Sequence, residues 1–215
     1  MIDDVKIYHL TTGNRLMIAG VLDTLDDAGW NAPTLCAGWT VRHLAAHLLQ
    51  PMLIGFGRFF LTAMRYRGDT GKTVDHVARR IARRPRAELV AVLRAHAEDR
   101  VNPPRVGPMG PFAETCIHLR DIARPLNLTV DVPTEHWRIL MAYLTSPRVA
   151  PALVPAGRLD GLQLVATDTD WNSGSGARVT GPIEALAMSV TGRPAGLTDL
   201  RGPGVGTLAG RLRAH

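Results

Sequence analysis

Three acid and base side chains recur at helical spacing near the middle of the chain. Glu114, His118 and Asp121 stand four and three residues apart, so on a helix they share one face. A carboxylate and an imidazole one turn apart can bind the same divalent cation, the first supplying charge and the second a borderline-soft nitrogen. Two such ligands do not close a site, so a third has to come from elsewhere. The same spacing is also typical of a solvated surface pair, with Asp121 facing Arg120 or Arg124.

The segment that must position this triplet is predicted to be a helix. Apolar residues recur at helical spacing over residues 111–128. Pro111 suits the first turn of a helix, and Pro125 predicts a bend or an end. The triplet therefore lies within one predicted helix.

A second predicted helix carries two more candidate ligands. It begins at Val41 with Thr40 as its N-cap, is expected to run to about residue 67, and should kink at Pro51. His43 and His47 stand four residues apart on it, so either or both could face a metal. A lone histidine on such a helix is more often a hydrogen-bonded structural residue.

The remaining chain predicts a helical domain followed by a small α+β appendage. Further helices are expected over residues 5–28, 74–84, 86–100, 133–144 and 148–154. After these, the alternation in Leu159–Trp171 predicts a strand, the segment NSGSG a turn, Ala177–Gly181 a second strand, and Pro182 the start of a helix to about Val190. We therefore expect a helical domain over residues 1–156 and an α+β domain over residues 157–215.

Composition and charge narrow the function classes. The 215 residues carry a formal net charge of +6, but the arginine-rich stretch 78–86 has no interleaved aromatic residues, which argues against specific nucleic-acid binding. Gly71-Lys72-Thr73 lacks the earlier glycine and the preceding strand of a phosphate-binding loop. No apolar run is long enough to cross a membrane, and the N-terminal residues are acidic where a signal peptide is basic, so we expect a cytoplasmic protein with no membrane partner.

Three sequence blocks resemble the mycothiol-dependent maleylpyruvate isomerase family, within the DinB-like putative metalloenzymes. They are residues 30–47 (W..PTLCAGWTVRHLAAH), 114–121 (ETCIHLRD) and 171–193 (WNSGSGARVTGPIEALAMSVTGR). The resemblance implies a mainly α fold, a DinB-like four-helix bundle followed by the small α+β appendage. It also implies a divalent metal, usually zinc, held by His47, Glu114 and His118.

The same resemblance implies a chemistry for that site. Three protein ligands leave one coordination position open, as a catalytic zinc requires. A thiol entering there would lose its proton, and the resemblance implies that this thiol is mycothiol. The thiolate would attack a small electrophile, giving isomerisation or S-transfer. Asp121 would orient a ligand histidine or a water, and Arg193 would bind a substrate carboxylate or, alternatively, cap a helix end.

Two other functions stay open at this stage. A metal-dependent hydrolase would use a bound water in place of the thiol. A non-catalytic metal-binding regulatory protein would fill the site with a fourth protein ligand, for which His43 is a candidate. Cys36 and Cys116, the two cysteines of the chain, are expected to be reduced, buried and not nucleophilic. The electrophile and the native metal are left open, and the chain is expected to be a monomer or a homodimer.

Overall fold

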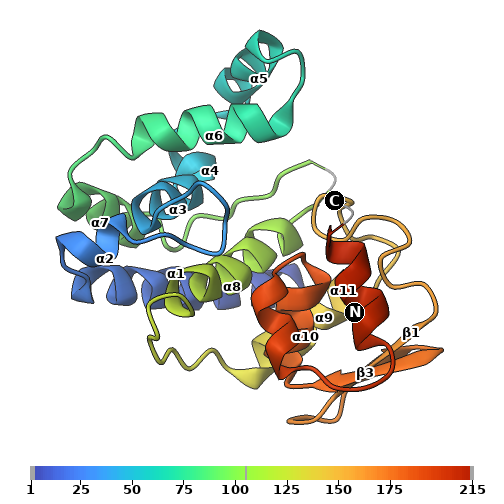
Figure 1. The fold of residues 1–215 in the computed structure, drawn as a ribbon. Helices are drawn as coiled ribbons and strands as arrows, with labels where there is room; N and C mark the ends of the chain where they lie inside the picture. Colours follow the sequence, from blue (N-terminus) through green and yellow to red (C-terminus); the bar gives the residue numbers. More distant parts are fainter. Residues whose placement is uncertain (1–2, 105, 214–215) are drawn as a thin grey trace. The chain divides into compact units, whose positions relative to one another are not determined.

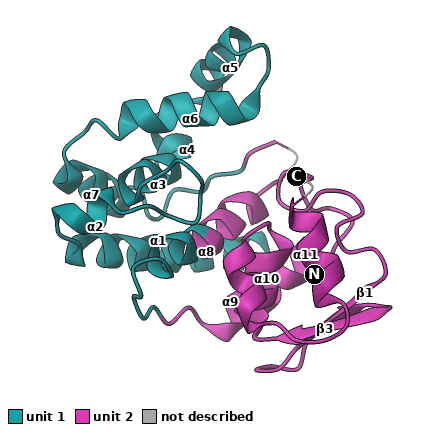
Figure 2. Ribbon diagram, viewed as in Figure 1, with its two compact units in different colours: residues 1–102, 118–130 teal, residues 103–117, 131–215 magenta. Residues whose placement is uncertain are grey.

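The computed structural model describes residues 3–104 and 106–213 and is mostly helical, with one small sheet in the C-terminal part of the chain (Figure 1). Met1, Ile2, Arg105, Ala214 and His215 lie outside the described residues. The chain forms two compact units, residues 1–102 with 118–130 and residues 103–117 with 131–215 (Figure 2). None of the described helices is both long enough and apolar enough to span a membrane.

The first unit holds the helices of the N-terminal half. They are α1 (Asp4–Thr24), α2 (Asp27–Asn31), α3 (Val41–Leu48), α4 (Gln50–Leu53), α5 (Phe56–Arg65), α6 (Thr70–Ile81), α7 (Arg86–Ala95) and the second half of α8 (Met109–Ala123). Helix α1 packs on α7, and α3 packs on α6. Buried aliphatic residues of these helices, including Ile18, Leu44 and Leu93, form the core.

Helix α8 has the boundaries that its prolines predicted. Pro111 lies in its first turn, and the helix ends at Ala123, two residues before Pro125. Pro125 cannot continue an α-helix, because it has no amide hydrogen and its ring clashes with the preceding turn. Asn127, with a positive φ of 52°, then turns the chain.

Two long predicted helices are interrupted in the structure. The helix expected over residues 5–28 is α1 followed by α2, because Asp26 accepts a hydrogen bond from the backbone N–H of Gly29 and so starts a new helix. The helix expected from Val41 to about residue 67 is three helices, α3, α4 and α5. Pro51 lies in the first turn of α4 rather than within one kinked helix.

The second unit combines helices with a three-stranded sheet. Its elements are the first half of α8, α9 (Thr134–Leu144), β1 (Leu162–Ala166), β2 (Asn172–Gly174), β3 (Ala177–Gly181), α10 (Ile183–Val190), a 3₁₀-helix η1 (Pro194–Asp199) and α11 (Val205–Arg213). The strand order is β2-β1-β3, with β2 antiparallel and β3 parallel to β1. Gly174 and Gly176 have positive φ, and a Cβ at either would collide with the backbone carbonyl of β1 or Gly161.

The α+β character of the C-terminal part and the helix after Pro182 are confirmed. Two local predictions here are wrong. Residues 148–154 form turns and irregular backbone instead of a helix, because Pro151 within the segment has no amide hydrogen and its ring clashes with the preceding turn. The segment NSGSG was expected to be a turn only, but its first three residues form β2. The domain boundary at residue 156 stays a prediction.

Candidate metal centre

Helix α8 holds a buried acid and base pair in the part of the helix that belongs to the first unit. The His118 Nδ1 atom lies 2.9 Å from Asp121 Oδ2, one helical turn further along. His118 is 8% exposed and Asp121 is completely buried. A carboxylate in such a place needs partners that neutralise and hydrogen-bond it, and the imidazole is one of them.

The loop over residues 33–40 brings a cysteine to the same carboxylate. Pro33 and Thr40 pair across the mouth of this loop, and Gly38 supplies the positive φ of 77° that its turn requires. The backbone N–H of Leu35 donates to the Asp121 carbonyl at 3.1 Å, which ties the loop to α8. As a result the Cys36 thiol donates to Asp121 Oδ2 at 3.2 Å and lies 3.9 Å from His118 Nδ1.

His47, near the end of α3, places a second imidazole beside the first. Its ring centroid is 5.0 Å from that of His118, with the two rings nearly perpendicular. The Trp39 indole also packs against His47, with ring centroids 5.2 Å apart. Trp39 is itself held by a 2.8 Å hydrogen bond from its indole N–H to Asp75 on α6. The His47 ring is therefore held beside His118 by a tryptophan that is itself held in place.

His43 has a different task on the same helix. Its Nδ1 accepts a hydrogen bond from the backbone N–H of Thr40 at 3.2 Å and lies 2.9 Å from the Thr40 hydroxyl. This closes a capping box at the start of α3, with histidine in the place usually taken by Glu or Gln. Burial lowers the pKa of His43, and Arg79 and Arg42 lower it further against the opposing effect of Asp75. The neutral ring therefore caps the N-terminal end of α3.

The remaining predicted site residues belong to the second unit. Glu114 lies in the first half of α8, half-buried, one helical turn before His118. Arg193 follows α10, and its guanidinium donates to the Thr191 carbonyl at 2.7 Å, close to the end of that helix. A cation beside the last carbonyls of a helix is a common stabilising arrangement.

Electrostatics in the first unit favour a charged His118 in the metal-free protein. Burial alone lowers its pKa, but the hydrogen bonds to Asp121 and Cys36 and the charge of Asp121 outweigh burial and raise the pKa to about 9. At neutral pH the imidazolium and the Asp121 carboxylate therefore form a buried ion pair. A metal at this histidine has to displace that proton, because a ligand imidazole binds through an unprotonated nitrogen.

The sequence analysis predicted a different role for one residue of this cluster, Cys36. Cys36 was expected to be a buried packing residue, yet it is half-buried and its thiol contacts both His118 and Asp121. Potential ligand atoms of these three residues lie within 4.8 Å of one another. The position of Cys36 between two tryptophans in a short loop was the available signal, but the 85-residue separation from Asp121 hid the contact.

The fold and this cluster define a class of mainly helical proteins with a histidine-based candidate metal centre. Residues 17–123 match the family profile described as mycothiol maleylpyruvate isomerase N-terminal domain. The chain therefore belongs to the mycothiol-dependent maleylpyruvate isomerase family.

Solved structures support the fold assignment. The crystal structure of the mycothiol-dependent maleylpyruvate isomerase superposes with a TM-score of 0.64 and 16% identity. A mutant of that enzyme, with one histidine replaced by alanine, gives 0.63 and 16%. Both alignments cover 94% of this chain and 93% of the other. They confirm the predicted fold class, a helical bundle with a small α+β appendage. No curated protein matches this chain in sequence.

Proposed function

We propose that this chain is a metal-dependent isomerase or S-transferase that uses mycothiol as a thiol cosubstrate on a small electrophile. The observation that carries the proposal is the buried His118–Asp121 pair beside His47, in a chain of this family. Family membership supports the thiol dependence. The identity of the metal, for which we propose zinc, rests on the chemistry of the side chains.

The donor set fits a divalent metal of the zinc type. Because Asp121 occupies the Nδ1 side of His118, the Nε2 atom is the one left to ligate. A carboxylate behind a ligand histidine is the usual outer partner in zinc proteins, where it fixes the ring and raises its basicity. We propose His47, Glu114 and His118 as the ligands, two nitrogens and one oxygen, which is a common catalytic combination.

The side chains of the centre would hold a thiol reaction in place. When bound, the cation would lower the pKa of a thiol cosubstrate and so supply a thiolate for attack on the electrophile. Asp121 keeps His118 in one orientation and one tautomer. The burial of both residues keeps bulk water away from that side of the centre. Arg193 stays a proposal for binding a substrate carboxylate.

Metal analysis with matched variants tests this proposal. Protein purified without an affinity tag should carry close to one zinc per chain, and His47→Ala, Glu114→Ala and His118→Ala should each lose it. His43→Ala is the matched control, because it removes a histidine four residues from His47 whose Nδ1 is used in the helix cap. Wild-type protein that neither contains zinc nor binds added zinc would refute the metal-dependent proposal.

Thiol dependence is tested after the metal. The zinc-loaded chain should convert activated double bonds or alkylating electrophiles only when mycothiol or a related low-molecular-weight thiol is added. Equal turnover without thiol would instead identify a hydrolase that activates water. The assay therefore separates the proposed transferase or isomerase from that alternative.

A non-catalytic metal-binding protein is the second candidate, and Cys36 favours it. Its thiol lies 3.9 Å from His118 Nδ1 and 3.2 Å from Asp121 Oδ2, so a metal on the Nδ1 side of His118, in place of the proposed Nε2 position, would take Cys36 as a ligand. A site closed by protein ligands alone is structural rather than catalytic. This candidate predicts that Cys36→Ala loses zinc, whereas the enzyme proposal predicts that Cys36→Ala retains it. The cytoplasmic location and the monomeric or homodimeric state stay predictions.

A further inference from the structure

The net positive charge of the chain is concentrated in one stretch, residues 54–85, called here the basic segment. It contains eight of the 25 lysines and arginines but two of the 19 acidic residues. The rest of the chain has seventeen of each and is formally neutral. The basic segment contains α5 and α6, which pack on each other. The excess charge is therefore a local property of this segment.

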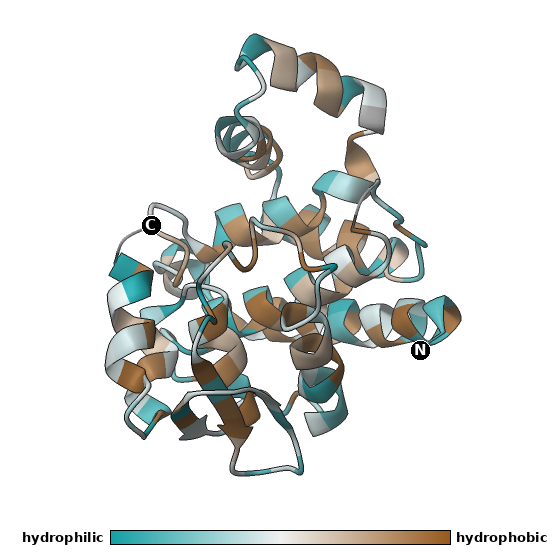
Figure 3. Ribbon diagram, turned by 90° about the vertical axis from the view of Figure 1, so that its right-hand side faces the viewer, coloured by the Kyte–Doolittle hydropathy of each residue, from teal (hydrophilic) through white to brown (hydrophobic). Residues whose placement is uncertain are grey.

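Helix α5 also exposes large apolar side chains. Phe60, Leu61 and Met64 are 56%, 61% and 54% exposed, and helical spacing places them on one face. Arg58 and Arg65, seven residues apart, flank that face, and α5 has no acidic residue. Figure 3 shows the apolar residues of the α5 region, drawn in brown, at the top of the view. Burying three large apolar side chains is favourable, so this face is a candidate binding surface.

A groove between α5 and α6 is lined by both apolar and positively charged side chains. Its volume is about 380 Å³. The aliphatic side chains of Ile54, Leu61, Val77 and Ile81 line it together with the guanidinium groups of Arg58 and Arg80. An occupant that matches this lining has an apolar part and a negatively charged part.

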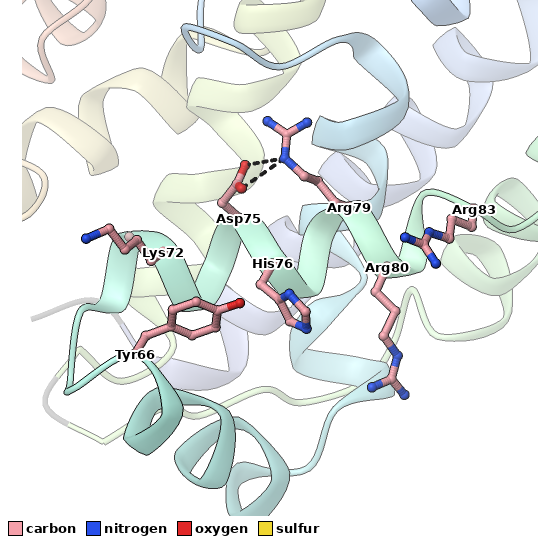
Figure 4. Close-up of a pocket in the computed structure, with 8 residues that line it drawn as sticks. Tyr66, Lys72, Asp75, His76, Arg79, Arg80 and Arg83 are labelled. Atoms are coloured by element: carbon pink, nitrogen blue, oxygen red, sulfur yellow. Dashed lines mark hydrogen bonds and ion pairs between the residues drawn. The ribbon is translucent and has the colours of Figure 1, made fainter.

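A second hollow of about 490 Å³ lies along α6, and most of the residues that line it are charged or polar. Figure 4 shows Arg79 bonded to Asp75, whereas Arg80 and Arg83 extend away from that pair. No described carboxylate forms an ion pair with Arg80 or Arg83. Lys72 lies on the same helix face, seven and eight residues before Arg79 and Arg80. Because Lys72 and Arg79 are paired with Asp69 and Asp75, the cations with spare hydrogen-bond donors are Arg80 on α6 and Arg83 just after it.

We propose that the basic segment docks on the surface of an anionic phospholipid bilayer. Cations beside exposed aromatic and aliphatic side chains on a short amphipathic helix are the features that bind such an interface. Arginine forks match phosphate groups, and Phe60, Leu61 and Met64 would enter the acyl boundary. This inference is independent of the proposed metal chemistry and goes beyond the partners expected from the sequence, which included no membrane.

The other occupants fit the segment less well. A second copy of the same face would bring two equally charged surfaces together, which is unfavourable. A nucleic acid would use the arginines but would leave the aliphatic side chains of α5 exposed to water. An acidic amphipathic protein is the closest competitor, and the test below separates it from lipid. Surface docking needs no membrane-spanning helix.

Vesicle flotation tests the proposal with the intact protein. The chain should float with vesicles that contain phosphatidylglycerol and stay in the bottom fraction with vesicles of phosphatidylcholine alone. Binding should weaken as salt is raised, because free ions screen surface charges over about 10 Å or less. Equal binding to both vesicle types, or no binding to either at low salt, would refute the proposal.

Matched variants locate the surface. Arg80→Gln with Arg83→Gln should weaken binding at least about tenfold. The variant loses two cations, and each cation near an anionic bilayer contributes about 1 kcal/mol to binding. Arg138→Gln with Arg148→Gln is the control, because it removes the same charge from exposed positions outside the basic segment. Phe60→Ser with Leu61→Ser should also weaken binding, whereas Val5→Ser with Leu16→Ser, two exposed apolar positions on α1, should not.

Folding and competing partners are checked in the same series. Circular dichroism and thermal unfolding must show that each variant keeps the wild-type fold, and Arg80→Gln alone serves if the double variant unfolds. Inorganic phosphate or an acidic peptide that binds as strongly as the vesicles would contradict the proposal in favour of a soluble anion or a protein. If the wild type forms a dimer and the Phe60→Ser, Leu61→Ser variant does not, the surface binds a second copy of the chain, and the lipid proposal is contradicted.

Discussion

The candidate metal centre and the basic segment differ in how their charges are balanced. In the centre, the carboxylate of Asp121 is fully buried and is bonded to His118 and Cys36. In the basic segment, Arg80 and Arg83 stand exposed, and positive charge exceeds negative. Charges that are buried must be matched inside the molecule, whereas exposed charges are solvated and can be matched by a partner. The contrast agrees with the catalytic role proposed for the first region and the binding role proposed for the second.

The largest effect is expected from removing the buried carboxylate. Asp121→Ala leaves His118 without its main partner and forces the ring to lose its proton in a buried place. In the metal-free protein this should lower the free energy of unfolding by roughly 2–4 kcal/mol. Urea unfolding at neutral pH measures the change. A loss no larger than that of an exposed ion pair would contradict the burial argument.

A pH series sharpens the same point. The folded-state pKa of His118 is about 9, above the usual value of 6.5, so the protonated ring stabilises the metal-free fold. That stabilisation is complete below about pH 6.5 and is lost as pH rises through about 9. Urea unfolding of the wild type should show this decline, and Asp121→Asn should flatten it. NMR titration of His118 in both proteins assigns the change to this ring.

A smaller effect is expected at His43, which belongs to a helix cap near the centre. His43→Ala removes the acceptor for the Thr40 backbone N–H and should cost about 0.5–2 kcal/mol. Zinc content should not change. Loss of zinc in this variant, at a stability that still keeps the protein folded, would make His43 a ligand and would reassign the fourth position of the site.

The smallest effect is expected in the basic segment. Arg80→Gln removes an exposed charge that has no described ion-pair partner, so the midpoint of urea unfolding should stay at the wild-type value or rise slightly. The rise would come from weaker repulsion within a stretch of like charges. A clear loss of stability would show that Arg80 has a structural task, which would weaken the comparison between the two regions.

Sequence patterns predicted the elements that proline or alternation controls. Pro111 and Pro125 set the limits of α8, and Pro182 starts α10. Patterns could not show that the long helix after Val41 breaks into three, because apolar residues continue through both interruptions. Helical periodicity reports which face is buried, but it does not report where the backbone hydrogen bonds stop.

Part of the candidate site could be predicted from the sequence, because some of its contacts are between residues close together in the chain. The spacing of His118 and Asp121 is local, so helical geometry alone predicts that they lie on one face. The contact of Cys36 with Asp121 depends on the fold of the loop and on its tie to α8, which no local pattern encodes. The same limit applies to His43, whose partner is set by the N-cap geometry at Thr40.

The distance along the chain between Cys36 and Asp121 has a consequence for synthesis. The two residues are 85 positions apart, whereas strands β1 and β3 pair residues only 15 positions apart. Closing a long loop costs more entropy than closing a short one, and folding is slower when contacts are distant in sequence. On the ribosome, the loop that carries Cys36 has no α8 to bind until more than half of the chain has emerged. Until then the nascent chain has neither His118 nor Asp121 with which to assemble this centre.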